Sequence, residues 1–213
     1  MWWWTSCHAA VMSEDTRMTY SKFIRRVVGA TFGLWAASLL LGGTALAEPT
    51  TEELIKDALS AAPPALRDSA GVMNEEGKMI REGSSDYICM PTAAEIRKFG
   101  SEPMCLDEVW RRWADAWLNK KPFETDRVGI GYMLAGDAAG ASNIDPFATE
   151  PTAENDWVVE GPHIMIIVPD ATQLAGLPDK PRPDGAYVMW KDTPYVHIMV
   201  PVGPRPKQRA VTQ

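Results

Sequence analysis

The sequence contains none of the short motifs that mark common catalytic and nucleotide-binding sites. There is no G-x-S-x-G nucleophile elbow, no G-x-x-x-x-G-K-[ST] phosphate loop, no H-E-x-x-H zinc motif and no G-x-G-x-x-G dinucleotide fingerprint. Histidine is also scarce, with three in the whole chain. These absences argue against the enzyme classes that the motifs define.

Basic residues are few, and none occurs from Val128 to Asp179. From Glu48 onward the chain has 17 Lys and Arg against 26 Asp and Glu, a net charge of −9 with histidine neutral. Because binding to a phosphate backbone needs a basic surface, this charge argues against nucleic acid as a partner.

The N-terminal part of the chain has the pattern of a secretory signal peptide at residues 18–47. A basic segment precedes an apolar run over residues 27–41, and Ala45-Leu46-Ala47 forms a cleavage site. An uncleaved membrane anchor is the alternative, but glycines dilute the run. An arginine pair leaves twin-arginine export open beside ordinary secretion. We expect an exported protein, periplasmic or secreted, that meets the membrane only during export, and residues 1–17 look like a spurious extension.

Cysteine is also scarce, and cleavage of the signal peptide would remove Cys7 and leave Cys89 and Cys105. An even pair in an exported chain predicts one disulfide. A metal or redox pair is the alternative, but the sequence has no C-x-x-C.

The remaining chain fits a single α+β domain, which we place at residues 48–203, with a loose tail at 204–213. Short apolar runs separated by turn residues predict strands, and short links between them favour antiparallel neighbours. The expected strands lie near residues 72–73, 78–81, 87–90, 128–134, 163–168, 186–190 and 195–202, and a short helix is expected near 50–61.

The strongest helical pattern covers residues 106–119. At 100° per residue its apolar side chains form one stripe with three tryptophans: Leu106, Val109, Trp110, Trp113, Ala114 and Trp117. A carbohydrate or cofactor platform is the alternative, but a stripe at helical spacing is typical of core. We predict that this amphipathic Trp-rich helix packs on one face of the sheet.

Two near-copies, residues 161–169 and 194–201, both contain His-Ile-Met followed by Val-Pro. Side chains alternate along a strand, so the histidine and methionine of each copy share one face and aliphatic residues share the other. Because the aliphatic side has no polar atoms to satisfy, we predict that it is the core side. The His/Met side would then be a partly closed face that binds a ligand.

The candidate ligand-binding residues combine this face with polar side chains nearby and in the long acidic loop 136–160: His163, Met165, His197, Met199, Tyr195, Asp145 and Asn143. Imidazole and thioether donors suit copper, particularly Cu(I), so the two histidines and two methionines are candidate metal ligands. The acidic loop lacks the spacing of a calcium loop and is expected to be a solvated surface. The alternative function is a small periplasmic enzyme with His163 or His197 as general base, assisted by Asp145 or Tyr195.

The Gly-Pro-His-x-Met motif at 161–165 and the Thr-Pro-Tyr-x-His-Ile-Met-Val-Pro motif at 193–201 resemble a family of small exported bacterial proteins. Further segments carry the same resemblance: 103–107, 131–134, 142–148 and 187–190. The resemblance implies export and a single domain, and it supplies no substrate, cofactor or catalytic residue. We therefore predict a non-enzymatic binding or envelope protein whose partner is a small ligand, a metal ion or another envelope component.

Overall fold

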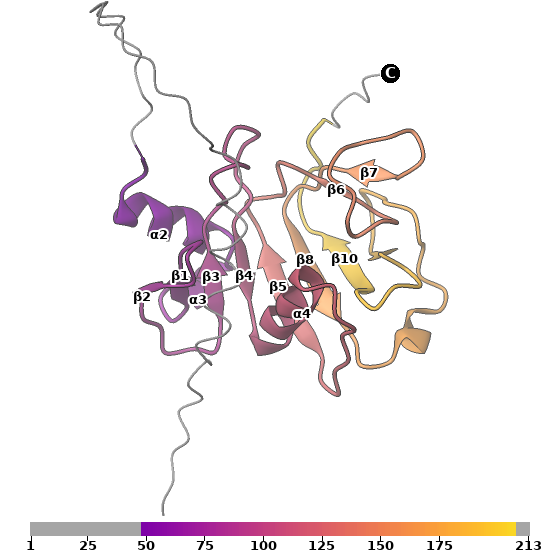
Figure 1. Ribbon diagram of the computed structural model, residues 1–213, viewed down its shortest axis with the longest axis horizontal. Coiled ribbons are helices and arrows are strands. Elements are labelled where there is room, and N and C mark those ends of the chain that lie inside the picture. The colour runs from indigo at the N-terminus through magenta and orange to yellow at the C-terminus, as the bar shows by residue number, and fades with distance from the viewer. Residues whose placement is uncertain (1–47, 208–213) are drawn as a thin grey trace, which may run out of the picture. The chain divides into compact units, whose positions relative to one another are not determined.

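The computed structural model describes residues 48–207, and Pro49 onward belongs to one compact unit. The predicted extension at 1–17 and signal peptide at 18–47 lie outside the described residues. The described part is a single sheet-rich domain with a few helices, which confirms the predicted α+β class (Figure 1).

Within the described residues, eight strands form one sheet in the order β2-β1-β3-β4-β5-β8-β10-β9. Every neighbouring pair is antiparallel except β1 with β3. The strands are β1 (Gly71–Met73), β2 (Met79–Arg81), β3 (Ile88–Met90), β4 (Met104–Leu106), β5 (Gly129–Met133), β8 (His163–Ile167), β9 (Tyr187–Met189) and β10 (His197–Pro201). A separate two-stranded sheet pairs β6 (Ala141–Ser142) with β7 (Trp157–Val158).

The helices are α2 (Thr51–Ser60), α3 (Pro64–Arg67), α4 (Glu108–Leu118) and the 3-10 helix η1 (Ala171–Leu174). Thr50 and Glu53 form a reciprocal capping box at the start of α2. Asp107 caps α4, and its second carboxylate oxygen accepts a hydrogen bond of 2.6 Å from Ile130 N in β5. The cap therefore also fixes the start of α4 to the sheet.

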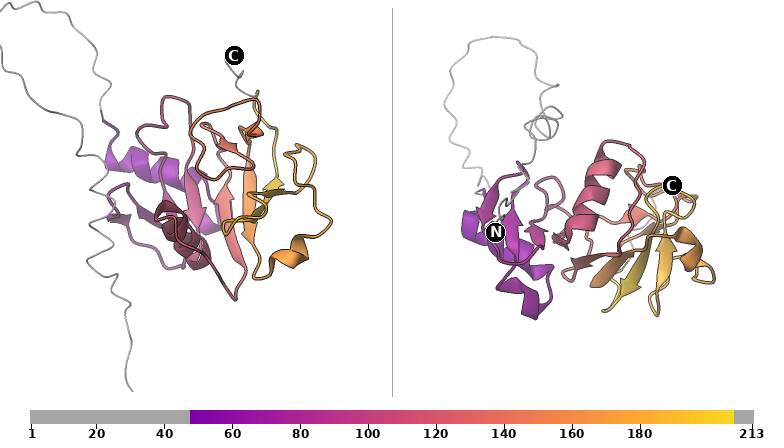
Figure 2. Two further views of the ribbon diagram at one scale, coloured as in Figure 1. Left: turned by 45° about the vertical axis from the view of Figure 1, so that its right-hand side comes forward. Right: turned by 90° about the horizontal axis from the view of Figure 1, so that it is seen from below.

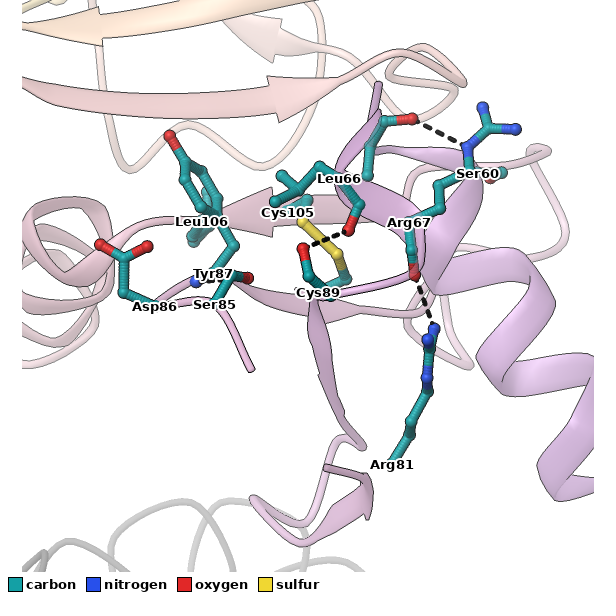
Figure 3. Close-up of a disulfide and its surroundings, with 12 residues drawn as sticks. Ser60, Leu66, Arg67, Arg81, Ser85, Asp86, Tyr87, Cys89, Cys105 and Leu106 are labelled. Carbon is teal, nitrogen blue, oxygen red and sulfur yellow. Dashed lines mark hydrogen bonds between the residues drawn. A yellow bond between two sulfur atoms is a disulfide. The ribbon is translucent and has the colours of Figure 1, made fainter. Parts of the chain in front are cut away.

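The disulfide between Cys89 and Cys105 is present, as predicted, and it lies inside the sheet. The two cysteines are directly opposite each other on β3 and β4, and both are fully buried (Figure 3). They pack with small residues from the end of α2, among them Ala58 and Ala61. Closing a loop of this length stabilises a fold by about 3 kcal/mol in the chain-entropy model.

Helices α2 and α4 cover different parts of the sheet on opposite faces. Side chains of α2 pack on the cysteine side of β3 and β4, whereas α4 packs on the other side, over β4, β5 and β8 (Figures 1 and 2). Two glycines of β5 allow the close approach of α4. A Cβ atom at Gly129 would lie 2.8 Å from Val109, and one at Gly131 would lie 3.0 Å from Leu106.

The prediction that the aliphatic side of β8 and β10 forms the core is wrong. His163, Met165, His197 and Met199 are buried and face the α4 side, whereas the intervening aliphatic residues are only half-buried. Polar atoms did not keep the histidines out of the core, because each imidazole Nδ1 bonds the main-chain carbonyl two residues before it. The large His197 ring then fills space among the tryptophans of the α4 side, which favours burial of this side of β10 over the aliphatic side.

We expect His197→Ala to destabilise the domain more than Ile198→Ala. Removing the imidazole leaves a cavity among tryptophans and should lower the free energy of unfolding by about 2–4 kcal/mol. Truncating the half-buried Ile198 should lower it by about 1 kcal/mol. Urea unfolding followed by tryptophan fluorescence, at low protein concentration, measures both. An equal or reversed order would contradict the observed assignment of the two faces.

Candidate functional site

The four predicted His/Met ligands lie on one face of two adjacent strands, but they do not converge as the repeat suggests. In the register of β8 with β10, Met165 is opposite Met199, and His163 is opposite Pro201. His197 is opposite Met189 of β9. The methionines therefore meet directly, while the histidines lie beyond them at opposite ends of the strand pair.

His197 is enclosed by three tryptophans. The centroid of its ring lies 5.2 Å from that of Trp110, 5.4 Å from that of Trp113 and 5.2 Å from that of Trp190, with the planes nearly perpendicular in each case. Its Nδ1 is 2.9 Å from Tyr195 O. Burial lowers the pKa of His197 to about 4, so the ring is neutral at pH 7.

His163 is fully buried and keeps one ring nitrogen without a partner. Nδ1 lies 2.7 Å from Gly161 O, and because a carbonyl only accepts, Nδ1 carries the proton. Nε2 then has a free lone pair, and it bonds no group of the described residues. Burial lowers the pKa of His163, although the nearby Glu160 acts in the opposite direction.

The remaining predicted ligands serve the loops that surround this core. Tyr195 donates to Lys121 O at 2.9 Å and packs edge-on against Trp113. The side-chain Nδ2 of Asn143 donates to Asp179 O, and the main-chain carbonyl of Asn143 accepts from Trp190 N. Asp145 is exposed and accepts from Phe147 N. Among the described residues, none of these three side chains bonds either imidazole.

Sequence reasoning missed a buried charged cluster at the His163 end of the sheet. Glu160 is 1% exposed and accepts two hydrogen bonds from Arg205, the shorter at 2.7 Å, and one from Tyr187 OH at 3.0 Å. Arg205 belongs to the segment predicted to be a loose tail. The segment is instead fixed to the domain up to Arg205 by the bonds between Arg205 and Glu160. A lone acidic residue directly before the Gly-Pro-His motif was the available signal.

A pair of carboxyl groups, from Glu102 and Asp137, lies beside this cluster. Glu102 accepts from Ala139 N and Asp137 accepts from Gly140 N, both at 2.7 Å, so adjacent amides bring the two side chains together. Burial and the Glu102 carboxylate raise the pKa of Asp137 well above its usual range. Asp137 therefore holds its proton to a higher pH than an isolated aspartic acid does.

The described surface has cavities, but neither histidine lines them. One cavity of about 260 Å³ lies between η1, the turn at 191–193 and Val188, and another of the same volume lies between α2 and residues 92–101. In the described residues no group of three or more His, Cys, Asp or Glu side chains could hold a metal ion.

The side chains on the opposite side of β5, β8 and β10 are mostly aliphatic, and no helix lies over these strands on that side (Figure 2). We call it the open aliphatic face, and it consists of Val128, Ile130, Ile164, Ile166, Val168, Ile198, Val200 and Val202. All are half-buried except Val128 and Val202, which are 53% and 52% exposed. Antiparallel sheets usually place polar residues on the side that faces water, so this composition calls for a function.

Comparison with protein-family models gives no match, and comparisons with curated proteins and with solved structures give none. The resemblance of the repeated motifs to small exported bacterial proteins therefore stays a prediction.

Acid should destabilise the domain through its buried imidazoles. In the unfolded chain His197 titrates near 6.5, so between that pH and about 4 the unfolded state binds a proton that the folded state refuses. Stability falls as pH drops through this window, by about 3 kcal/mol from His197.

Urea unfolding at a series of pH values, compared between the wild type and His197→Phe, measures this effect. The variant should show a shallower loss over the same window, with the remainder coming from His163 and from carboxylates. Parallel curves for the two proteins would show that His197 is not the titrating group.

Proposed function

We propose that this chain is an exported, non-enzymatic binding domain of the cell envelope that contacts its partner through the open aliphatic face. The observation that carries the proposal is the contrast between the two sides of β5, β8 and β10. The side with the histidines and methionines is buried, whereas the aliphatic side has no covering helix. Exposed apolar patches of this kind are typical of interaction sites.

The Cys89–Cys105 disulfide supports export, because disulfides persist in oxidising compartments. It is compatible with the signal peptide predicted at residues 18–47, after whose removal the folded domain would act outside the cytoplasm. Among the described residues no helix has the length and apolar character required to cross a bilayer.

The general-base alternative has weaker support. A general base must reach a proton on its substrate, directly or through one water. His163 and His197 are at most 2% exposed, and the predicted helpers Asp145 and Tyr195 bond other groups. Buried, neutral imidazoles in a tryptophan-lined core fit a packing role better than catalysis.

Photocrosslinking tests the proposed binding face. We expect Ile166→p-benzoylphenylalanine to give covalent adducts in cells that export the protein, because its side chain points out of the open aliphatic face. Leu118, which is 58% exposed on α4, provides the matched control position and should give none. Absence of adducts at both positions, or equal adducts at both, would refute the proposed face.

A soft metal ion is the second candidate partner, and one observation favours it. Both imidazoles commit Nδ1 to a main-chain carbonyl, the arrangement that orients many metal-binding histidines, and His163 Nε2 is left without a partner. Met165 and Met199 lie directly opposite each other between them. Imidazole nitrogen and thioether sulfur would suit Cu(I), which this side of the sheet would take up as a buried structural ion.

We expect one equivalent of Cu(I), added anaerobically during refolding because the face is closed in the folded domain, to remain bound after desalting. Met165→Leu combined with Met199→Leu should weaken retention at least about tenfold, because the substitution removes both thioethers at similar volume. Met73→Leu, in β1 and outside the site, is the control. Copper that is not retained, or that the control loses equally, would exclude the site.

A further inference from the structure

We propose that the partner of the open aliphatic face is a second copy of this chain, packed face to face about a two-fold axis. This inference rests on the proposed binding role of the face and names its occupant. The argument comes from the pattern of the side chains, from charge and from area.

The open aliphatic face is regular and lies in the middle of the sheet. Strand register places Ile130, Ile166 and Ile198 directly opposite one another, and the row ends at Val188 of β9, which is buried beside η1. The next row pairs Ile164 with Val200, and it ends at Tyr132 of β5, which packs against the α2 side of the disulfide cluster. A surface of β-branched side chains in register is suited to interdigitate with another sheet about 10 Å away.

A second copy of the chain brings a matching aliphatic surface to the contact, whereas another protein would need such a surface by chance. In a two-fold dimer the same patch contributes both sides, so an aliphatic surface automatically meets an aliphatic surface. The β5, β8 and β10 strands are internal to the sheet, so the contact would pack side chains and leave the main-chain hydrogen bonds of each sheet unchanged.

The charge of the chain favours this face over the rest of the surface as the contact between two copies. Residues 48–213 carry a net charge of −9, so two copies repel each other through most of their exteriors. The eight residues of the open aliphatic face carry no ionisable group. Two copies that meet here avoid placing acidic side chains directly opposite one another in the contact.

Area fits a dimer whose apolar core is this face. Three strands at ~4.8 Å spacing and ~3.4 Å rise over seven residues give about 350 Å². A stable interface takes about 800 Å² from each partner and has an apolar core with a polar rim. The open aliphatic face thus has the size of the apolar core of such an interface. Turns that border it, such as 126–128 and 190–193, would form the polar rim.

Sedimentation-velocity ultracentrifugation of residues 48–213, across a wide concentration range, tests the inference. We expect a monomer–dimer equilibrium that strengthens with added salt, because salt screens the repulsion between acidic copies while apolar contact remains. Ile166→Lys should raise the dimer Kd at least about tenfold, because the two-fold axis buries the new charge on both sides. Leu118→Lys on α4 should leave the Kd unchanged.

Near-UV circular dichroism of the tryptophan core verifies that each variant is folded, and Ile198→Thr serves as a milder change if Ile166→Lys does not fold. A wild type that stays monomeric at every concentration, or a dimer that neither face variant weakens, overturns the inference. In the photocrosslinking experiment, adducts of twice the chain mass support a second copy. If all adducts have another mass, the face still binds a partner but that partner is not a second copy. The proposed binding face and the proposed dimer can therefore fail independently.

Discussion

The close packing of α4 on β5 is the contact on which the rest of this structure depends. Gly129 and Gly131 remove the side chains that would hold the helix away, and Asp107 bonds both the helix start and Ile130 of the sheet. Trp110 and Trp113 can then reach across β5 and donate to the carbonyls of Met165 and Tyr195. Their rings enclose His197 on that side of the sheet. One helix position thus determines which side of the sheet is closed and which is open.

Much of the architecture follows from local sequence. The apolar stripe of residues 106–119, the turn residues between short β-branched runs and the even cysteine pair predicted α4, the antiparallel strands and the disulfide. These features depend on nearest neighbours along the chain or on simple redox chemistry, so a single sequence carries them.

The orientation of the sheet could not be predicted in the same way. Both sides of β8 and β10 carry large side chains, and the choice between them depends on what packs from elsewhere. Gly129 and Gly131 of β5 lie on the same side of the sheet as the histidines and methionines, and α4 fills the space that the two glycines leave. Glu160 and Arg205 are 45 residues apart, so no pattern of neighbouring residues identifies them as partners. Long-range partners of this kind are recognised only in three dimensions.

The two sides of the central strands therefore have separate tasks. One side supplies rigidity through stacked indoles, such as Trp113 and Trp190 with planes 2° apart, and through imidazoles held neutral by burial. The side chains on the other side are less buried than those that face α4. Substitutions on the open side should therefore perturb the fold less than substitutions on the α4 side.

The bond between Arg205 and Glu160 also bears on when the domain can finish folding. A polypeptide leaves a ribosome or a translocation pore with its amino end first, so Glu160 emerges well before the only cation that bonds it among the described residues. Until Arg205 arrives, closing the core would bury an uncompensated carboxylate, a state that costs several kcal/mol. The closed core is therefore favourable only once the C-terminal segment with Arg205 is present. Completion of the native state thereby depends on one of the last described residues of the chain.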